Sequence, residues 1–206
     1  KMYTRGDGKK GQDISFLISY VVPPEFDRSK IKDKMAIRGE LIISKKNFKK
    51  VNKELKKKGE KELKNARNTV AGLVNSKTIS TRLHIAEITD FVAYTIVFPR
   101  YSHDTQLKKI KKIGLYTVKN KETDNLDSNE LSDYLVKRRT KGSYEVDGIV
   151  VNDCSKAYPL ETKNPTHAFA FKTILKDQVA EATIVDVLWD VSKDGYIKPR
   201  VQIKPV

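Results

Sequence analysis

Cysteine is nearly absent, since Cys154 is the one cysteine among 206 residues. A lone thiol excludes an internal disulfide and a structural zinc site built from several thiolates, and it indicates a reducing compartment such as the cytoplasm. Long apolar runs are also missing: the richest segments, 14–22 and 91–98, are far shorter than the roughly 20 residues that cross a membrane. No signal peptide is visible and residue 1 is Lys rather than Met, so we expect a chain that was processed, trimmed or cut from a longer one.

Acidic residues are scarce relative to basic ones, with 26 Asp and Glu against 41 Lys and Arg, which leaves a formal net charge of +15. Such an excess suits a polyanionic partner, because each phosphate that is neutralised releases condensed counterions. An AT-rich genome, whose codons favour Lys, Asn, Ile and Tyr, explains the same excess without any partner. Hydrophobic residues make up 38% of the chain, which is enough to bury a core.

The pattern of apolar residues predicts a mixture of strands and helices. Apolar or alternating segments bounded by turn residues predict strands at 14–22, 35–43, 91–98, 146–151 and 167–173. Apolar spacing of three and four residues and N-cap residues predict helices at 45–58, 105–114 and 127–137. From residue 179 onward, two apolar stretches flank a Lys-Asp-Gly turn, which predicts a β-hairpin. The irregular order of these elements favours an α+β fold over a doubly wound parallel sheet.

Five short motifs carry polar residues that could bind a ligand, and each has an ordinary structural explanation too. Residues 4–8 (T-R-G-D-G) form a glycine-rich loop or a plain surface turn, and 66–72 (A-R-N-T-V-A-G) taken alone indicate a helix start. The glycine in 38–40 (R-G-E) makes room for a ligand or another backbone, although strand charges usually face solvent. Asp147 precedes a strand, where it could hold a metal or ribose or cap a turn. Lys172 ends an apolar stretch, so it meets an anion such as a phosphate or reaches water at a sheet edge.

The order of these motifs resembles that of the NAD-dependent DNA ligases over almost all 206 residues. That order is T-R-G-D-G, R-G-E, A-R-N with A-G, an isolated strand tyrosine, V-D-G-I-V-V and A-F-K. The resemblance implies an α+β adenylation (nucleotidyltransferase) domain over residues 1–176, incomplete at its N-terminus, with antiparallel sheets flanked by helices. It also implies that 177–206 begin an oligonucleotide-binding (OB) domain, to whose first strands V-D-V, G-Y-I-K-P and K-P-V are similar.

The family's reaction has three steps. A lysine attacks NAD, releases nicotinamide mononucleotide and keeps AMP as a phosphoramide. AMP then passes to the 5′ phosphate of a nick, and the adjoining 3′ hydroxyl displaces AMP to seal the strand. The resemblance therefore implies NAD as the AMP donor, Mg²⁺ as the metal ion and nicked duplex DNA as the partner, in DNA replication and repair. A virus or phage with an AT-rich genome is the expected source, acting in the host cytoplasm, or in the bacterial cytoplasm if the source is bacterial.

The matching motifs imply five roles at an adenylate site. Glu40 contacts the ribose, and Tyr94 offers its ring to the adenine. Arg67 lies near the phosphates, and Lys172 neutralises the α-phosphate. Asp147 helps to hold the metal ion. Glu40, Asp147 and Lys172 are thus implied to be the catalytic residues.

Further residues either match the family or depart from it. Arg139 matches an arginine that precedes V-D-G and is implied to bind the cofactor, whereas Arg5 shapes its loop or touches DNA. Asn152 stands at the cofactor where the family has a lysine, and Asn75 stands on the DNA-binding side where it has an arginine. Each lost charge-assisted bond is worth roughly 1.5–3 kcal/mol. The family's nucleophilic K-x-D-G motif is absent from the 206 residues, so we expect an upstream segment or a partner subunit to supply that lysine.

Two alternatives stand beside a working ligase fragment or subunit. One is a ligase-derived module that holds DNA or a nucleotide without catalysis, which Asn75, Asn152 and the absent nucleophile favour. The other is an RNA ligase or capping enzyme of the same superfamily, which the T-R-G-D-G loop disfavours.

Overall fold

The computed structural model of the chain describes residues 1–8, 10–76, 78–159, 164–172 and 181–205. The chain divides into two compact units, Lys1–Phe171 and Lys172–Val206. The domain boundary expected between residues 176 and 177 lies outside the described residues, as does Thr173 at the end of an expected strand.

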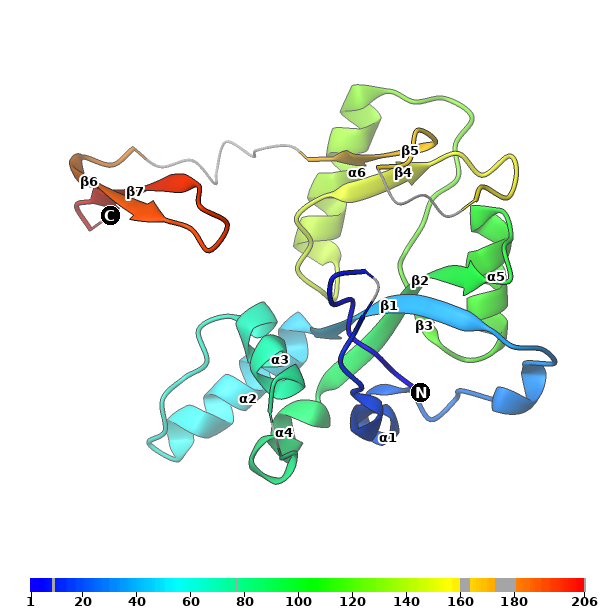
Figure 1. The fold of residues 1–206 in the computed structure, drawn as a ribbon, viewed down its shortest axis with the longest axis horizontal. Helices are drawn as coiled ribbons and strands as arrows, with labels where there is room; N and C mark the ends of the chain where they lie inside the picture. The colour runs from blue at the N-terminus through cyan, green and yellow to red at the C-terminus, as the bar shows by residue number, and fades with distance from the viewer. Residues whose placement is uncertain (9, 77, 160–163, 173–180, 206) are drawn as a thin grey trace. The chain divides into compact units, whose positions relative to one another are not determined.

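Helices and strands are mixed along the first unit, which confirms the α+β class (Figure 1). Its longer helices are α2 (Lys45–Lys57), α3 (Ala66–Val74), α5 (His103–Lys112) and α6 (Ser128–Lys141). Its short helices are η1 (Ser15–Leu17), α1 (Ile18–Val21), η2 (Arg28–Lys30), η3 (Ser80–Arg82) and α4 (Leu83–Ala86). Its strands are β1 (Ala36–Ile43), β2 (Thr89–Phe98), β3 (Tyr116–Thr117), β4 (Ile149–Asn152) and β5 (Ala168–Phe171). Within the described ranges, every helix falls short of the length or the apolarity that a membrane-spanning segment requires.

The strands of this unit form one sheet of β1, β2 and β3 and a separate pair of β4 and β5. β1 runs antiparallel to β2, and β4 runs antiparallel to β5. β3 instead pairs in parallel with β2, through Val92 and Tyr116, so the expectation of antiparallel sheets holds for the other two strand pairs and is wrong for this one. The reason is the connection: α5 lies between β2 and β3 in the sequence, and a helical crossover returns the chain in the same direction.

The strand expected at 14–22 is also wrong, because this segment is helical. Ile14, Leu17 and Val21 have exposed fractions of only 3%, 0% and 2%, whereas Tyr20 has 37%. Buried residues spaced three and four apart lie on one side of a helix, whereas a strand would bury every second residue. Burial against the core therefore selects the helical spacing over the alternating one.

Two clusters of buried side chains support the β1–β2 ladder. One surrounds Leu17, Leu73 and Ile85 and is closed by α1 to α4. The other surrounds Ile96 and Ile110 and is closed by α5. Figure 1 shows α2, α3 and α4 gathered near one end of the ladder and α5 near the other. The ladder is therefore held from both ends, which fixes the strands that carry the candidate site.

Gly39 is required by packing inside the ladder. A Cβ atom built on this residue would lie 2.6 Å from the Val92 carbonyl oxygen and 2.7 Å from the Phe91 ring. Contacts that short do not occur, so any larger residue would displace the Phe91 ring or the backbone. Of the two expected reasons for a glycine here, the structure shows the close approach of another backbone.

The second unit contains a hairpin of β6 (Ile184–Val191) and β7 (Ile197–Ile203), as the sequence predicts. Its turn contains Gly195, whose φ of +82° lies in the left-handed region that favours glycine. Most of its large apolar side chains are exposed, with Trp189 at 66% and Tyr196 at 70%. A two-stranded hairpin of this kind is marginal by itself and needs a partner surface.

Candidate functional site

One face of the β1–β2 ladder carries charged and aromatic side chains. Along β1 the exposed Arg38 and Glu40 alternate with residues that face the core. The pairing register shifts between Arg38 and Gly39, so that Arg38 lies opposite Thr95 and Gly39 opposite Ala93. Tyr94 is the extra residue on β2 at this shift. A bulge of this kind commonly redirects a side chain beside a site.

The electrostatics of Tyr94 show which side chains surround it. Burial raises the pKa of its hydroxyl, the positive charges of Arg38 and Arg5 oppose that rise, and the negative charge of Glu40 adds to it. These charges act on the hydroxyl only if they lie near it. The ladder therefore carries Arg38, Glu40 and Tyr94 together, and the charge of Arg5 acts on the Tyr94 hydroxyl from the loop near the N-terminus.

The loop that carries Arg5 is held by its own hydrogen bonds. The backbone N–H of Gln12 donates to Thr4 Oγ1 at 2.9 Å, and that of Lys10 donates to Asp7 Oδ1 at 2.7 Å. Gly6 has a φ of +53°, and a Cβ there would meet the Lys10 carbonyl oxygen at 1.7 Å. The T-R-G-D-G motif is thus a tight turn that fixes the position of Arg5.

Arg67 and Asp147 form an ion pair, although 80 residues separate them in the sequence. The Arg67 guanidinium lies 3.7 Å from Asp147 Oδ2, and the two side chains are 79% and 77% exposed. Arg67 is the second residue of α3, whose start is capped by the Asn65 side chain accepting from the N–H of Asn68 at 3.0 Å. Water screens so exposed a pair, so it contributes little stability and leaves both charges available to a ligand.

Arg139 holds the loop that contains Asp147. Its guanidinium donates to the Asp147 carbonyl oxygen at 2.7 Å and to the Val146 carbonyl oxygen at 3.4 Å. Arg139 lies in the last turn of α6, so it anchors this loop to a helix. Arg139 therefore acts as a positioning residue for the loop of Asp147.

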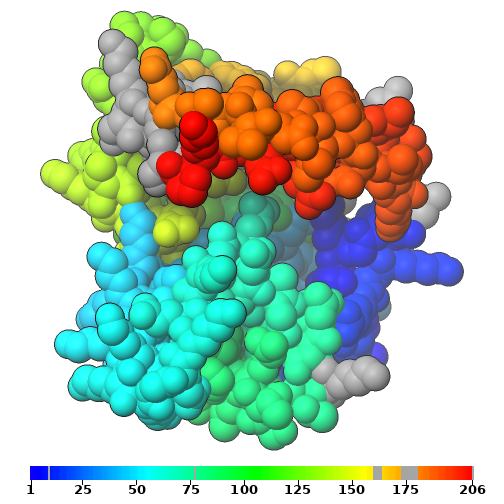
Figure 2. Space-filling view, turned by 90° about the vertical axis from the view of Figure 1, so that its left-hand side faces the viewer, coloured from blue at the N-terminus to red at the C-terminus, as the bar shows by residue number. Residues whose placement is uncertain are grey.

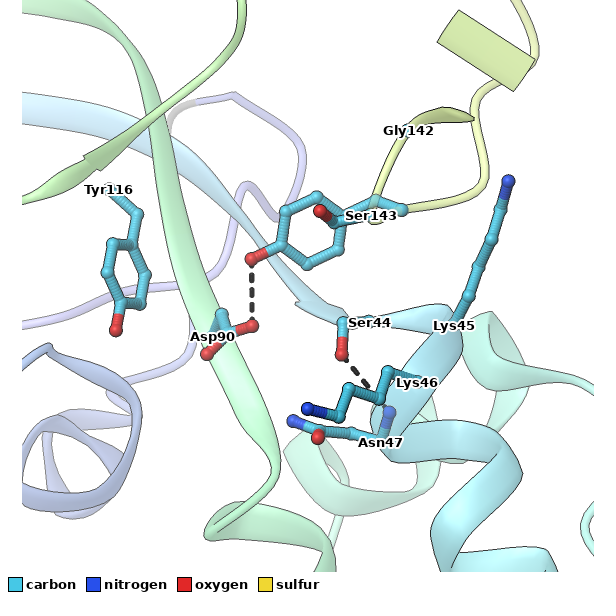
Figure 3. A pocket seen from close by; sticks show the side chains of 9 residues that line it. Ser44, Lys45, Lys46, Asn47, Asp90, Tyr116, Gly142 and Ser143 are labelled. Carbon is cyan, nitrogen blue, oxygen red and sulfur yellow. Dashed lines mark hydrogen bonds between the residues drawn. The ribbon is translucent and has the colours of Figure 1, made fainter. Parts of the chain in front are cut away.

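A pocket of about 510 Å³ lies between the start of α2, β2 and the loop after α6 (Figure 3). It is lined by Ser44, Lys45, Lys46, Asn47, Asp90, Tyr116, Gly142, Ser143 and Tyr144. Across it the Tyr144 hydroxyl donates to Asp90 Oδ2 at 2.8 Å. Burial raises the pKa of the Asp90 carboxyl while this hydrogen bond opposes the rise. Burial also raises the pKa of the Tyr144 hydroxyl, and the bond to Asp90 raises it further.

The two groups of residues lie on the same side of the ladder. Side chains alternate along a strand, so Asp90, Val92 and Tyr94 share one face of β2. Glu40 lies opposite Val92 and therefore shares that face. Because Tyr144 bonds to Asp90, the loop after α6 also meets this face. The structure thus places the ladder residues and the Asp147 loop around one surface.

Among the described residues, three other sequence candidates take no part through their side chains in the hydrogen bonds and ion pairs given above. Asn75 caps the C-terminal end of α3, about 12 Å along the helix axis from Arg67, and is exposed. Asn152 ends β4 opposite Ala168 and is partly buried. Lys172 follows the last residue of β5, is exposed and is the first residue of the second unit.

The carboxylates of the site suit a metal ion that is shared with a phosphate. Among the described residues, no three His, Cys, Asp or Glu side chains lie together as a metal cage. Asp147 is one exposed carboxylate beside one guanidinium. Mg²⁺ is commonly held by one or two carboxylates together with substrate phosphates and water. Asp147 fits that donor set and would supply a single oxygen ligand to it.

Sequence reasoning missed Asp90, Tyr144 and the contacts of Lys45. Lys45 donates through its backbone N–H to the Ser143 carbonyl oxygen at 2.8 Å, and its ammonium group donates to the Arg139 carbonyl oxygen. An aspartate at the start of an apolar strand was the available signal for Asp90. This signal could not identify Tyr144 as the hydrogen-bond partner of Asp90, because Tyr144 lies 54 residues further along the chain.

Comparison with known proteins adds to this geometry. The profile of the NAD-dependent DNA ligase adenylation domain matches residues 1–174. The chain is 38% identical over 206 residues to a DNA ligase of Acanthamoeba polyphaga mimivirus, covering 100% of this chain and 31% of that protein. It is 30% identical over 217 residues to a DNA ligase of Natranaerobius thermophilus, covering 98% of this chain and 31% of that protein. The chain thus spans about a third of the length of these relatives.

Proposed function

The chain belongs to the NAD-dependent DNA ligase family, and from this premise we propose that the protein seals nicks in duplex DNA with NAD as the AMP donor. Residues 1–176 would supply its nucleotidyltransferase domain, and 177–206 would begin an OB domain whose first hairpin is β6–β7. The observation that carries the proposal is the charged and aromatic face of the ladder, with Glu40 and Tyr94, to which the Tyr144–Asp90 bond joins the loop after α6. A protein that uses NAD and DNA in this way would work in the cytoplasm of a bacterium or of an infected cell.

We propose that the nucleotide base and sugar of AMP lie over the ladder. The Tyr94 ring, 36% exposed, offers a flat surface on which adenine can stack. Glu40 is exposed on the same face and can accept hydrogen bonds from ribose hydroxyls. The charge of Arg5 acts on the Tyr94 hydroxyl, and its guanidinium can approach a phosphate or the DNA backbone. Asn152, in place of a lysine, would approach the base through its amide.

The phosphates would then lie toward the loop after α6. The reaction breaks a P–O bond of NAD and forms a P–N bond to a lysine, so negative charge builds up on the oxygens of the α-phosphorus. Arg67 is exposed and can turn from Asp147 to a phosphate oxygen, and Arg139 stands beside the same loop. Bound Mg²⁺ would offset part of that charge, with Asp147 as its protein ligand. Lys172 would add a further cation, and its place in the A-F-K motif supports that role.

The first test asks whether AMP reaches a lysine. The 206-residue chain is mixed with NAD, Mg²⁺ and a segment or subunit that carries a K-x-D-G lysine, and the AMP adduct is sought by intact-mass spectrometry. We expect an adduct on that lysine, lost in Lys172→Ala and kept in the control Lys193→Ala, which alters an exposed turn. Absence of the adduct together with intact DNA binding would establish the inactive module instead, a result that Asn75 and Asn152 favour.

The second test isolates the last step. A nick that already carries AMP on its 5′ phosphate requires no lysine nucleophile, because the 3′ hydroxyl attacks that phosphate directly. We expect the chain with Mg²⁺ to seal this substrate and Glu40→Ala to seal it at least about tenfold more slowly, the loss of one charge-assisted bond. Equal sealing rates for Glu40→Ala and the unaltered protein would refute the role of Glu40 in the site.

A further inference from the structure

α2 carries a dense group of lysines on its outer side. Its 13 residues, K-K-N-F-K-K-V-N-K-E-L-K-K, contain one acidic residue, Glu54. Its basic residues are Lys45, Lys46, Lys49, Lys50, Lys53, Lys56 and Lys57. Phe48, Val51 and Leu55 pack into the core, so the remaining surface of the helix is almost wholly cationic. In Figure 2 this helix, in cyan, lies at the molecular surface.

Within the part of the chain that the structure describes, the lysines of α2 form no ion pair with a carboxylate. Among the described residues, no ion pair includes a lysine of this helix, and Lys45 bonds to the carbonyl oxygen of Arg139 instead. Like charges four residues apart, such as Lys46 and Lys50, repel each other and destabilise a helix. The structure therefore keeps a row of mutually repelling charges in solvent, which an external polyanion would relieve.

In contrast to α2, helix α5 has lysines that interact with other side chains of the protein. Lys108 pairs with Asp104 at 3.2 Å, and the Lys109 ammonium lies 4.5 Å from the centre of the Tyr101 ring. These lysines belong to a helix with a similar cationic end. A merely lysine-rich surface would give both helices the same surroundings, so the difference between them points to a role for α2.

We propose that the exposed lysines of α2 bind the sugar-phosphate backbone of duplex DNA, an inference that rests on the proposed ligase function. Lys46, Lys50, Lys53 and Lys57 follow one stripe of the helix that is about 16 Å long. Duplex DNA carries one negative charge per roughly 1.7 Å of its axis, so such a stripe faces several phosphates. Lysine ammonium groups bind phosphates as point charges and carry no base readout, which suits an enzyme that acts at any sequence.

The position of α2 connects this stripe with the candidate site. The helix begins at Lys45, which bonds to the carbonyl oxygens of Arg139 in the last turn of α6 and of Ser143 in the loop after it. DNA lying along α2 would therefore lead to the loop of Asp147. An anionic membrane fits less well, because a membrane-binding helix inserts its apolar side and the apolar side of α2 is buried in the core.

The test compares two variants with the same loss of charge. One changes Lys46, Lys50, Lys53 and Lys57 of α2 to Gln, and the control changes Lys108, Lys109, Lys111 and Lys112 of α5 to Gln. Glutamine keeps a high helix propensity, and circular dichroism checks that both variants fold. Fluorescence anisotropy then measures the dissociation constant for nicked duplex DNA from 50 to 200 mM salt.

We expect the α2 variant to bind at least about tenfold more weakly and its salt slope to fall by about 2–4, since each lost phosphate contact removes about 0.9. The α5 variant should change affinity by less than about threefold. Equal losses in both variants, no loss in either, or α2-dependent binding to phosphatidylserine vesicles with DNA binding unchanged would each overturn the inference. If the unaltered chain binds no duplex DNA, both the proposed DNA-binding surface and the proposed DNA substrate are refuted. A loss that is equal in both variants refutes the surface alone.

Discussion

Removing the Tyr144 hydroxyl tests how the loop of the candidate site is held against β2. This hydroxyl donates to Asp90 Oδ2 at 2.8 Å, and both side chains are partly buried. Tyr144→Phe deletes one oxygen and keeps the ring. Asp90 would then lose the donor that opposes the effect of burial on its carboxylate.

The expected loss follows from the kind of bond. A hydrogen bond to a charged group contributes about 1.5–3 kcal/mol, and water can replace part of it here, so we expect a loss of about 1–2 kcal/mol. For a unit of this size, each kcal/mol lowers the melting temperature by about 2–4 °C, so a decrease of about 2–8 °C should be seen. Urea unfolding and calorimetry at pH 7 measure both quantities.

Tyr20→Phe is the matched control, because Tyr20 is 37% exposed and makes no hydrogen bond through its hydroxyl to another described residue. The loss in Tyr144→Phe should also shrink as the pH falls through the pKa of Asp90, since a protonated carboxyl binds the hydroxyl less strongly. A change below about 0.5 kcal/mol, or equal losses in both variants, would refute the assignment.

Three further predictions concern separate features. Gly114→Ala should lower the free energy of unfolding, measured with urea, by about 2–4 kcal/mol. The reason is that Gly114 has a φ of +83° and that a Cβ there would lie 1.9 Å from the Glu25 carbonyl oxygen. An unchanged midpoint of urea unfolding would contradict this. Burial raises the pKa of Asp90, so the stability that depends on its protonation is complete below pH 3.8 and is lost as the pH rises through the raised pKa. The free energy of unfolding of Asp90→Asn should therefore rise relative to that of the unaltered protein as the pH rises through that window. A difference between the two free energies that stays constant with pH would refute this. Arg67→Ala should change stability by less than about 0.5 kcal/mol, because its pair with Asp147 is exposed, yet reduce AMP-adduct formation about tenfold or more.

The lysine-rich helix explains why net charge alone was ambiguous. The sequence shows an excess of 15 positive charges, and this excess fits a nucleic-acid partner or a biased genome equally well. Only the structure separates lysines that pair with a carboxylate, such as Lys108, from lysines such as Lys50 that form no ion pair with any described residue. Charge becomes informative once the surroundings of each ammonium group are known.

Some local structure followed from the sequence, and some did not. The helix expected at 45–58 and the hairpin after residue 179 are confirmed, because their apolar spacing and turn residues are local signals. The apolar residues of segment 14–22 fit both the alternating spacing of a strand and the three-and-four spacing of a helix. Burial of Leu17 and Val21 decided for the helix. The parallel pairing of β3 depended on the path of α5, which no local pattern records.

The sequence by itself determined the family, because an ordered series of short polar motifs is a property of the chain and needs no coordinates. It also named Glu40, Tyr94, Arg67 and Asp147 as site residues, roles that stay predictions. Tertiary structure alone decided which side chains meet: Arg67 with Asp147 across 80 residues, and Tyr144 with Asp90 across 54. The physical reason is that hydrogen bonds and charge interactions act over a few ångströms in space, and distance along the chain does not reveal which groups come that close.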